Sequence, residues 1–234
     1  MRSACLGTAE VLVVMDVAEL TFTVHDLDEV EQRFRDLMVP WSGGDATDAA
    51  LLTAERENIG RHGYGIKGCV LSMVLTAGEI SDGAIDARSL AGIVGWGHEM
   101  MAHPIELLDG VPEALDDLGA THRLLLITKG DLGDQLGKVE RSGLADRFWR
   151  VEVVPEKDGP TYRDVLDRHG VHPAEFTMVG NSVKSDVLPV LAIGGRAIHV
   201  PHTTTWAFEK PDPADLDGVD FPVVDRLTDV AALL

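Results

Sequence analysis

The chain has 234 residues, a length that fits one large domain or a core with an inserted subdomain. Its hydrophobic content of 45% predicts a folded core rather than disorder, and no apolar run is long enough to span a bilayer. The formal net charge of -19 disfavours nucleic acid and anionic membranes as partners. Cys5 and Cys69 are too few for a cysteine-based metal site and indicate a reduced, cytoplasmic protein.

Residues 11–26, VLVVMDVAELTFTVHD, begin with an apolar run that ends at a single carboxylate, Asp16. The run predicts a buried first strand whose carboxyl end presents Asp16. One arginine and a short apolar run precede Asp16, so we expect this segment to be a strand and not a signal peptide.

Residues 27–104 have a different, helical pattern. The segments with helical periodicity are 27–38, 48–60, 66–80 and 87–101, and turn-forming residues separate them. Lys67 is the only lysine of this block, and Gly65 and Gly68 beside it indicate a bend or a close backbone approach. We therefore predict an all-helical subdomain inserted after the first strand.

From residue 105 onward, apolar strands alternate with amphipathic helices. The expected strands are 122–128, 149–155, 175–182 and 196–201, with an edge strand at 221–227, and the expected helices are 111–121, 131–148, 161–170 and 185–195. Unbroken apolar strands that alternate with helices are typical of a parallel sheet covered on both faces. The predicted fold is therefore α/β, with a core of residues 1–26 and 105–234 and a helical subdomain of residues 27–104.

Residues suited to binding phosphate or metal gather at the predicted carboxyl ends of the strands, where open parallel sheets bind ligands. They are Asp16, Thr128, Lys129, Gly130, Lys157, Asn181, Ser182, Ser185 and Asp186. The carboxylates of Asp16 and Asp186 can share one Mg²⁺. The Thr128 hydroxyl, backbone N–H groups at a helix start and the Lys157 ammonium can hold phosphate oxygens. The pattern predicts a small anionic substrate.

These positions fall, in order, into the motifs of a known superfamily. The segments LLLITKGD, VVPEKD and MVGNSVKSD, with the strand that ends at Asp16, resemble the haloacid dehalogenase-like (HAD) hydrolases over essentially the whole chain. The segment YGIKG, together with the second and fourth motifs, resembles a phosphatase-like group of that superfamily. The resemblance implies a Rossmann-like, three-layer parallel core with a helical cap inserted after the first motif.

The resemblance also implies roles for individual residues. It assigns Asp16 as the nucleophile, Thr128 as the phosphate-binding hydroxyl, Lys157 as the lysine of the third motif, and Asp16, Asp186 and the backbone carbonyl of Ala18 as ligands of Mg²⁺. Substrate-binding roles are expected for Lys67, Lys129, Gly130 and Asn181.

The first motif departs from the family pattern at two positions. Ala18 stands where family phosphatases have the aspartate that protonates the leaving oxygen, and Leu20 replaces a hydroxyl residue that steadies the loop. Such a proton donor supplies a factor of about 10² to 10⁴ in rate. We therefore expect weak activity on ordinary alkyl phosphates and a preference for acyl, enol or aryl phosphates, whose leaving groups need that proton less.

Three functions remain open at this point. The first is a Mg²⁺-dependent hydrolase that acts on a small phosphorylated metabolite through Asp16. The second is a repurposed, non-phosphatase catalyst on the same scaffold, for which Lys67 would be the one candidate Schiff-base lysine of the helical block. The third is a ligand-binding relative without catalysis. The oligomeric state is not predicted.

Overall fold

The structure is a computed structural model that describes residues 12–15, 21–22, 25–201, 209 and 211–234. The expected nucleophile, Asp16, and the expected metal ligand Ala18 lie outside the described residues.

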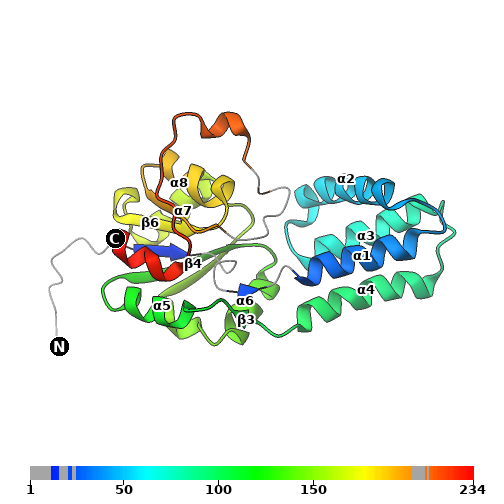
Figure 1. Ribbon diagram of the computed structural model, residues 1–234, viewed down its shortest axis with the longest axis horizontal. Coiled ribbons are helices and arrows are strands. Elements are labelled where there is room, and N and C mark those ends of the chain that lie inside the picture. The colour runs from blue at the N-terminus through cyan, green and yellow to red at the C-terminus, as the bar shows by residue number, and fades with distance from the viewer. Residues whose placement is uncertain (1–11, 16–20, 23–24, 202–208, 210) are drawn as a thin grey trace.

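A five-stranded parallel sheet forms the centre of the larger part of the molecule (Figure 1). Its strands are β1 (Leu12–Met15), β4 (Arg123–Lys129), β5 (Arg150–Val154), β6 (Phe176–Gly180) and β7 (Arg196–His199), in the order β5-β4-β1-β6-β7. All four pairings are parallel, as the sequence predicts. The central strand β1 ends at Met15, which pairs with Leu126 of β4 and Val179 of β6.

Helices cover both faces of this sheet because successive side chains of each strand point to opposite faces. Leu124 and Leu126 of β4 pack into a core cluster with α5 and α6, whereas Leu125 and Ile127 pack into a second cluster with α7 and α8. The helices are α5 (Val111–Gly119), α6 (Leu132–Arg141), α7 (Gly159–His169) and α8 (Leu188–Ala192). The predicted three-layer α/β core is therefore confirmed.

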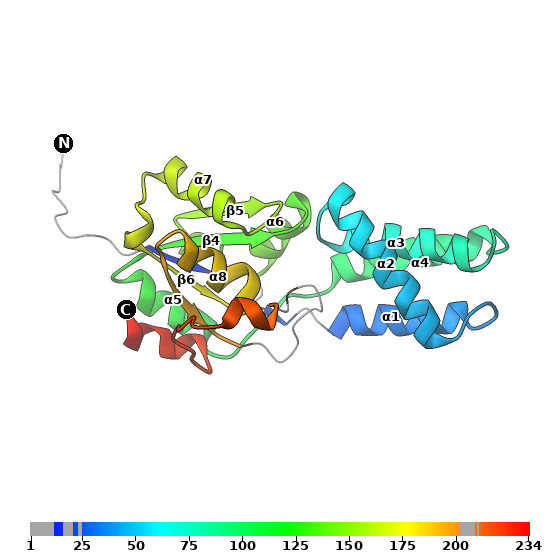
Figure 2. The same ribbon diagram turned by 90° about the horizontal axis from the view of Figure 1, so that it is seen from above.

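Four helices between β2 (Thr21–Phe22) and β3 (Glu106–Leu107) form a separate bundle at the carboxyl end of the sheet (Figures 1 and 2). They are α1 (His25–Met38), α2 (Gly44–His62), α3 (Ile66–Ile80) and α4 (Ala87–Ala102), each close to its predicted range. Their core includes Phe34, Met73 and Ile93, all fully buried. A side chain at Gly97 would overlap Val70, so glycine allows α4 to approach α3 closely.

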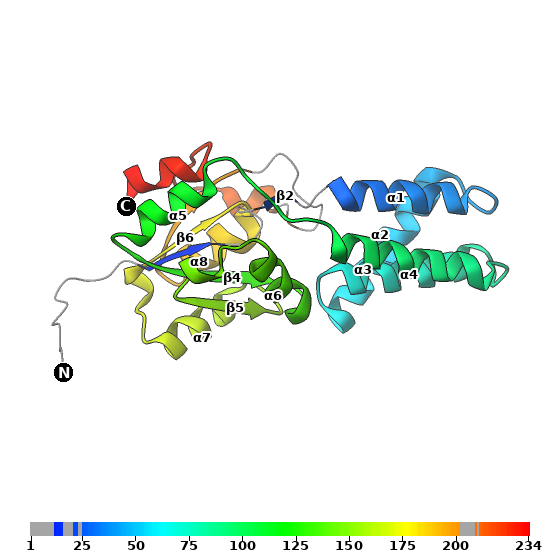
Figure 3. The same cartoon turned by 90° about the horizontal axis from the view of Figure 1, so that it is seen from below.

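A short antiparallel ribbon joins the helical bundle to the sheet. It consists of β2 (Thr21–Phe22) and β3 (Glu106–Leu107), and Figure 3 shows β2 at the junction of the two parts. The division of the chain at residues 27 and 104 stays a prediction, although the ribbon lies close to both positions. Within the described ranges, no helix has both the length and the apolar character that a membrane span requires.

Two predicted elements near the C-terminus differ in the structure. The expected edge strand at 221–227 is a single bridge between Val223 and His199, because Pro222 has no N–H to extend the ladder. The expected helix at 185–195 is divided into a π-helical turn (Val183–Val187) and α8. Short 3₁₀ turns complete the described elements: Ala145–Arg147, Pro173–Glu175, Pro213–Leu216 and Leu227–Leu233.

Candidate active site

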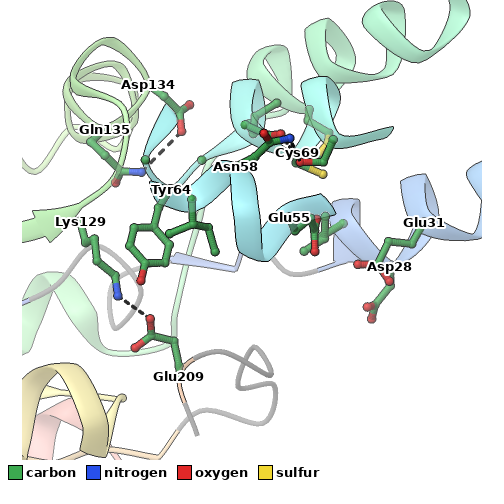
Figure 4. A pocket seen from close by; sticks show the side chains of 18 of the residues that line it. Asp28, Glu31, Glu55, Asn58, Tyr64, Cys69, Lys129, Asp134, Gln135 and Glu209 are labelled. Carbon is green, nitrogen blue, oxygen red and sulfur yellow. Dashed lines mark hydrogen bonds and ion pairs between the residues drawn. The ribbon is translucent and has the colours of Figure 1, made fainter. Parts of the chain in front are cut away.

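A cavity of about 640 Å³ lies between the carboxyl ends of the strands and the helical bundle (Figure 4). The core lines it with Lys129, Asp134, Gln135, Lys138, Arg141, Lys157, Asn181, Ser182, Ser185 and Glu209. The bundle lines it with residues of α1, α2 and α3 and with Met100 near the end of α4. Its volume is in the range of small-molecule sites.

The end of β4 delivers Thr128 to this region. Thr128 is 1% exposed, and its hydroxyl donates a hydrogen bond of 2.9 Å to Oε1 of Gln135, which lines the cavity. The next turn requires glycine, because Gly130 has a φ of +147° and a side chain there would approach the Gln135 amide to 2.9 Å. Asp131 then accepts a hydrogen bond from the Asp134 backbone N–H and caps α6.

The loops after β5 and β6 bring Lys157 and Asp186 together. The Lys157 Nζ lies 2.7 Å from Oδ1 of Asp186, and both side chains are buried. The other carboxylate oxygen, Oδ2, accepts a hydrogen bond of 2.9 Å from the Ser182 backbone N–H. A Cβ atom at Gly180 would lie 2.3 Å from the Asp186 carboxylate, so the strand end must be glycine for the carboxylate to sit there.

Lys129 is the centre of an anion-binding cluster on the core side. Its Nζ contacts Oε1 of Glu209, Oε1 of Glu156 at 3.1 Å and Oγ of Ser185 at 3.2 Å. The hydroxyls of Ser182 and Ser185 donate to the other carboxylate oxygen of Glu209, at 2.6 and 2.5 Å. An ammonium and two hydroxyls thus converge on one carboxylate, which is the donor set that a phosphate group also needs.

The electrostatics of Glu209 agree with this description. Burial by itself raises the pKa of a carboxyl group, but the Lys129 charge and the hydrogen bonds from Lys129, Ser182 and Ser185 outweigh it and lower the pKa of Glu209. Glu209 is therefore ionised near neutral pH and acts as an internal anion at this site.

Tyr64 and Lys67 of the helical bundle contact the core beside the cavity. The Tyr64 hydroxyl donates to Oε2 of Glu156 at 2.8 Å, and the Tyr64 ring lies 4.0 Å from the Lys129 ammonium. Lys67 forms an ion pair with Asp131 at 2.8 Å, and this contact lowers the pKa of Asp131. The Lys67 side chain nevertheless remains 60% exposed. The YGIKG segment thus contacts two core loops, the one after β4 that carries Asp131 and the one after β5 that carries Glu156.

The structure therefore brings most of the described candidates to one edge of the sheet. Lys129, Lys157 and Asn181 line the cavity. Thr128 and Gly130 lie against Gln135, which also lines it. Asp186 contacts Lys157 and Ser182 of the cavity wall. The backbone carbonyl of Asn181 accepts a hydrogen bond of 3.0 Å from His199. Lys67 instead lies at the junction, where its ammonium is occupied by Asp131.

Several residues of the site were not predicted from the sequence. Gln135 could have been found, because it lies one helical turn after the cap Asp131 and faces back toward Thr128. Tyr64 precedes Gly65, whose φ of +123° turns the chain toward the core. Glu209 has no local signal, because it belongs to a connection without hydrophobic periodicity.

The expected metal site lies partly within the described residues. Among the described residues, no three or more His, Cys, Asp or Glu side chains are grouped so that they could hold a metal ion. Asp186 supplies a carboxylate that Lys157 and the Ser182 N–H hold in place at the carboxyl end of β6. Oxygen ligands of this kind suit Mg²⁺, so the donor chemistry fits, with the expected partners Asp16 and Ala18 outside the described residues.

Comparison with known proteins identifies the family. No family model matches the sequence. A solved structure, a haloacid dehalogenase-like family hydrolase from Xanthomonas campestris, is 36% identical, superposes with a TM-score of 0.84, and the match covers 99% of this chain and 93% of that one. The chain belongs to the haloacid dehalogenase-like hydrolases. The predicted HAD fold with a helical insertion is thereby confirmed.

Other HAD-like proteins agree with the assignment. N-acylneuraminate-9-phosphatase from Mus musculus is 30% identical over 161 residues, which are 65% of this chain and 62% of that protein. The chain therefore matches less than two thirds of the length of this curated relative. L-2-haloacid dehalogenase from Xanthobacter autotrophicus shares the fold with a TM-score of 0.64 at 18% identity, over 96% of this chain and 98% of that one.

Proposed function

We propose that the protein is a HAD-type hydrolase that releases phosphate from a small phosphorylated metabolite with a good leaving group. The observation that carries the proposal is the anion site, in which Lys129, Ser182 and Ser185 hold the carboxylate of Glu209 beside the Lys157–Asp186 pair. A phosphoryl group offers acceptor oxygens of the same kind with more charge. The similarity to a phosphatase supports the same reaction class.

In the proposed reaction, a carboxylate oxygen of Asp16 attacks phosphorus. The bond between phosphorus and the leaving oxygen breaks, and the leaving group takes the electron pair. Asp16 then carries the phosphoryl group as an acyl phosphate. Water attacks this phosphorus, its proton passes to solvent, and cleavage of the bond to Asp16 regenerates the carboxylate and releases inorganic phosphate.

The surrounding residues bind and orient the phosphoryl group in this proposal. The Thr128 hydroxyl turns from Gln135 to a phosphoryl oxygen, and Lys157 and Lys129 supply positive charge near the oxygens that gain negative charge. Asp16, Asp186 and the Ala18 carbonyl would hold Mg²⁺, which when bound offsets the charge of the phosphoryl oxygens.

Ala18 sets the kind of leaving group. Alanine can neither protonate the leaving oxygen nor activate water, and loss of such a group costs a factor of about 10² to 10⁴. The proposed substrate is therefore an aryl, enol or acyl phosphate, or another ester whose leaving group is stable as an anion.

The test compares release of phosphate from 4-nitrophenyl phosphate and propyl phosphate in the presence of Mg²⁺. We expect turnover of the aryl ester at least about 10²-fold faster than that of the alkyl ester. Asp16→Asn should abolish both activities, Ala18→Asp should raise turnover of propyl phosphate, and the exposed control Asp146→Asn should change neither. Failure to release phosphate from any activated ester would exclude the proposal.

The same measurements separate the two other functions. A repurposed catalyst would keep its activity after Asp16→Asn or in the absence of Mg²⁺, and a binding protein would bind ligand without turnover. The ion pair between Lys67 and Asp131 gives no support to a Schiff-base role, because that lysine is held at the junction.

A further inference from the structure

The bundle end of the cavity contains a buried carboxylate that the proposed reaction does not use. Glu55 on α2 lines the cavity and is 7% exposed. Among the described residues it has no salt bridge, and its side-chain hydrogen-bond partner is the thiol of Cys69 on α3. Figure 4 shows Glu55 and Cys69 in the bundle, away from Lys129 and Glu209 at the core end.

The polar side chains beside Glu55 form hydrogen bonds elsewhere in the bundle. The Asn58 amide donates to Oγ of Ser72 at 3.0 Å, and the Ser72 hydroxyl donates to the Gly68 carbonyl at 2.8 Å. The Ser72 hydroxyl has only one proton, which it donates to Gly68, and both Asn58 and Ser72 are neutral, so neither supplies a charge that compensates Glu55.

Two of the cations that line the cavity are also paired. Arg35 of α1 contacts Asp48 at 2.7 Å and Glu31 at 3.3 Å, and Lys138 of α6 contacts Asp134 at 3.2 Å. A carboxylate buried without a cation is costly, and most buried carboxylates in proteins are ion-paired or bind a metal. Its position on a cavity wall indicates that the compensating charge comes from a ligand.

The electrostatics of the bundle end support a cationic ligand. Burial, and next the charge of Glu31, raise the pKa of Glu55 to about 7. Burial also raises the pKa of Glu31. Both shifts result from incomplete neutralisation, so a positive group that enters the cavity would be stabilised by these two carboxylates.

The two ends of the cavity thus have opposite character. The core end presents Lys129 and Lys157, and the bundle end presents Glu55 and Glu31, with apolar side chains such as Leu51 and Ile59 in the bundle wall. A ligand that is negative at one end and positive at the other matches this arrangement, with an apolar frame between its charges.

We propose that the substrate carries a protonated amine, which binds to Glu55 while its phosphate binds at the core end. The inference rests on the proposed phosphate-releasing function and names the substrate class of the same site, a phosphate ester with an ammonium group. Glu55 acts as a specificity-determining residue.

The test uses two aryl phosphates of nearly equal shape, 4-(aminomethyl)phenyl phosphate and 4-(hydroxymethyl)phenyl phosphate. Binding is measured by calorimetry without Mg²⁺, so that the esters are not turned over, and at pH 8, where Glu55 is ionised. We expect the wild-type protein to bind the amine at least about tenfold more tightly than the alcohol, which corresponds to about 1.4 kcal/mol.

Glu55→Gln should abolish this preference, because it keeps the shape of the side chain and removes the charge. Glu57→Gln makes the same change at an exposed position of the same helix and should retain the preference. Equal binding of the two esters by the wild-type protein, or an unchanged preference in Glu55→Gln, would overturn the inference.

Binding and phosphate release separate this inference from the proposed function. An amine preference that depends on Glu55, without phosphate release, would support the amine site and reject the hydrolase. Equal release of phosphate from both esters with equal affinities would support the hydrolase and reject the amine site.

Discussion

At the scale of single residues, the site is defined by carboxylates whose charges are compensated to different degrees. Asp186 has the Lys157 ammonium and a backbone N–H, and Glu209 has an ammonium and two hydroxyls. Glu55 has only the Cys69 thiol among the described residues. The pKa of Glu209 is therefore lowered and that of Glu55 is raised, although both side chains are substantially buried.

Replacement of Glu209 tests whether its carboxylate occupies the phosphate position. Glu209→Gln removes the negative charge beside Lys129, so we expect inorganic phosphate to bind about tenfold more tightly, measured by calorimetry with Mg²⁺. The matched control is Glu113→Gln, at an exposed position of α5. An unchanged or weaker affinity in Glu209→Gln would mean that the carboxylate does not compete with phosphate.

Glu55 should also make the stability of the fold depend on pH. The pKa of Glu55 is about 7 in the folded protein, against 4.5 for an unperturbed glutamate as in the unfolded chain. Between pH 4.5 and pH 7 the folded state therefore binds more protons than the unfolded state. Stability contributed by this group is therefore lost as the pH rises from 4.5 to 7. Above pH 7, Glu55→Gln should be more stable than the wild-type protein by on the order of 3 kcal/mol.

Urea unfolding at pH 4 and pH 8 measures this effect. The difference between Glu55→Gln and the wild-type protein should be small at pH 4 and large at pH 8, and Glu57→Gln should show no such change. A pH-independent difference would contradict the raised pKa of Glu55.

At the scale of secondary-structure elements, the ends of the parallel strands determine where the reactive groups meet. β4 ends in Thr128 and Lys129, and β6 ends in Gly180 before the π-helical turn that carries Asp186. The π turn places Asp186 against the backbone of Gly180, with no room for a side chain between them. The geometry of the fourth motif thus depends on one glycine.

Substitution of Gly180 tests this dependence. A Cβ atom at this position would lie 2.3 Å from the Asp186 carboxylate, so Gly180→Ala should destabilise the protein by about 2 kcal/mol and strongly reduce phosphate release. The control is Gly78→Ala in α3, where a Cβ meets nothing within 4 Å. This change should stabilise the protein by up to about 1 kcal/mol. Equal unfolding curves for the two variants would contradict the close packing of Asp186 against Gly180.

Much of this element-level arrangement could be predicted from the sequence. Apolar periodicity identifies the helices of the bundle, and unbroken apolar runs identify the strands, because both patterns reflect burial. The grouping of Thr128, Lys157 and Asp186 follows from the rule that parallel strands present their carboxyl ends at one edge. The prediction of an edge strand at 221–227 was wrong. The composition of this segment suits a strand, but Pro222 prevents a continuous ladder of hydrogen bonds.

The rest of the site depends on tertiary structure and could not be predicted in this way. Glu209 reaches Lys129 across 80 residues, and Tyr64 reaches Glu156 across 92 residues. Neither contact can be predicted from the hydrophobic periodicity of the segments that carry Glu209 and Tyr64. The roles of Asp16 and Ala18, which lie outside the described residues, stay predictions.

At the scale of the whole molecule, the cavity is formed by two parts that share few polar contacts among the described residues. Tyr64 and Lys67 connect the bundle to the loops after β4 and β5, and the β2–β3 ribbon connects the chain itself. Exposed ion pairs contribute little to stability. The contacts of Lys67 and Tyr64 therefore matter more for the position of the bundle over the cavity than for the fold.

The double variant Tyr64→Phe with Lys67→Ala tests this separation of roles. It removes the hydrogen bond to Glu156 and the ion pair to Asp131, so we expect kcat/KM on an aryl phosphate to fall about tenfold through a raised KM. The free energy of unfolding should change by less than about 1 kcal/mol. Unchanged kinetics would show that these contacts do not position the bundle, and a large loss of stability would show that they hold the fold together.

Glu209 has a further consequence for the product of the proposed reaction. The Glu209 carboxylate is tethered to the chain and contacts Lys129. Tethered groups commonly have effective concentrations in the millimolar range, and free phosphate must compete with that concentration to displace the carboxylate. Inorganic phosphate lacks the contacts of an organic substituent. After the reaction has formed it, the Glu209 carboxylate would therefore displace it from Lys129. A substrate with additional contacts along the cavity can still compete, so the same side chain would promote product release and select for larger esters.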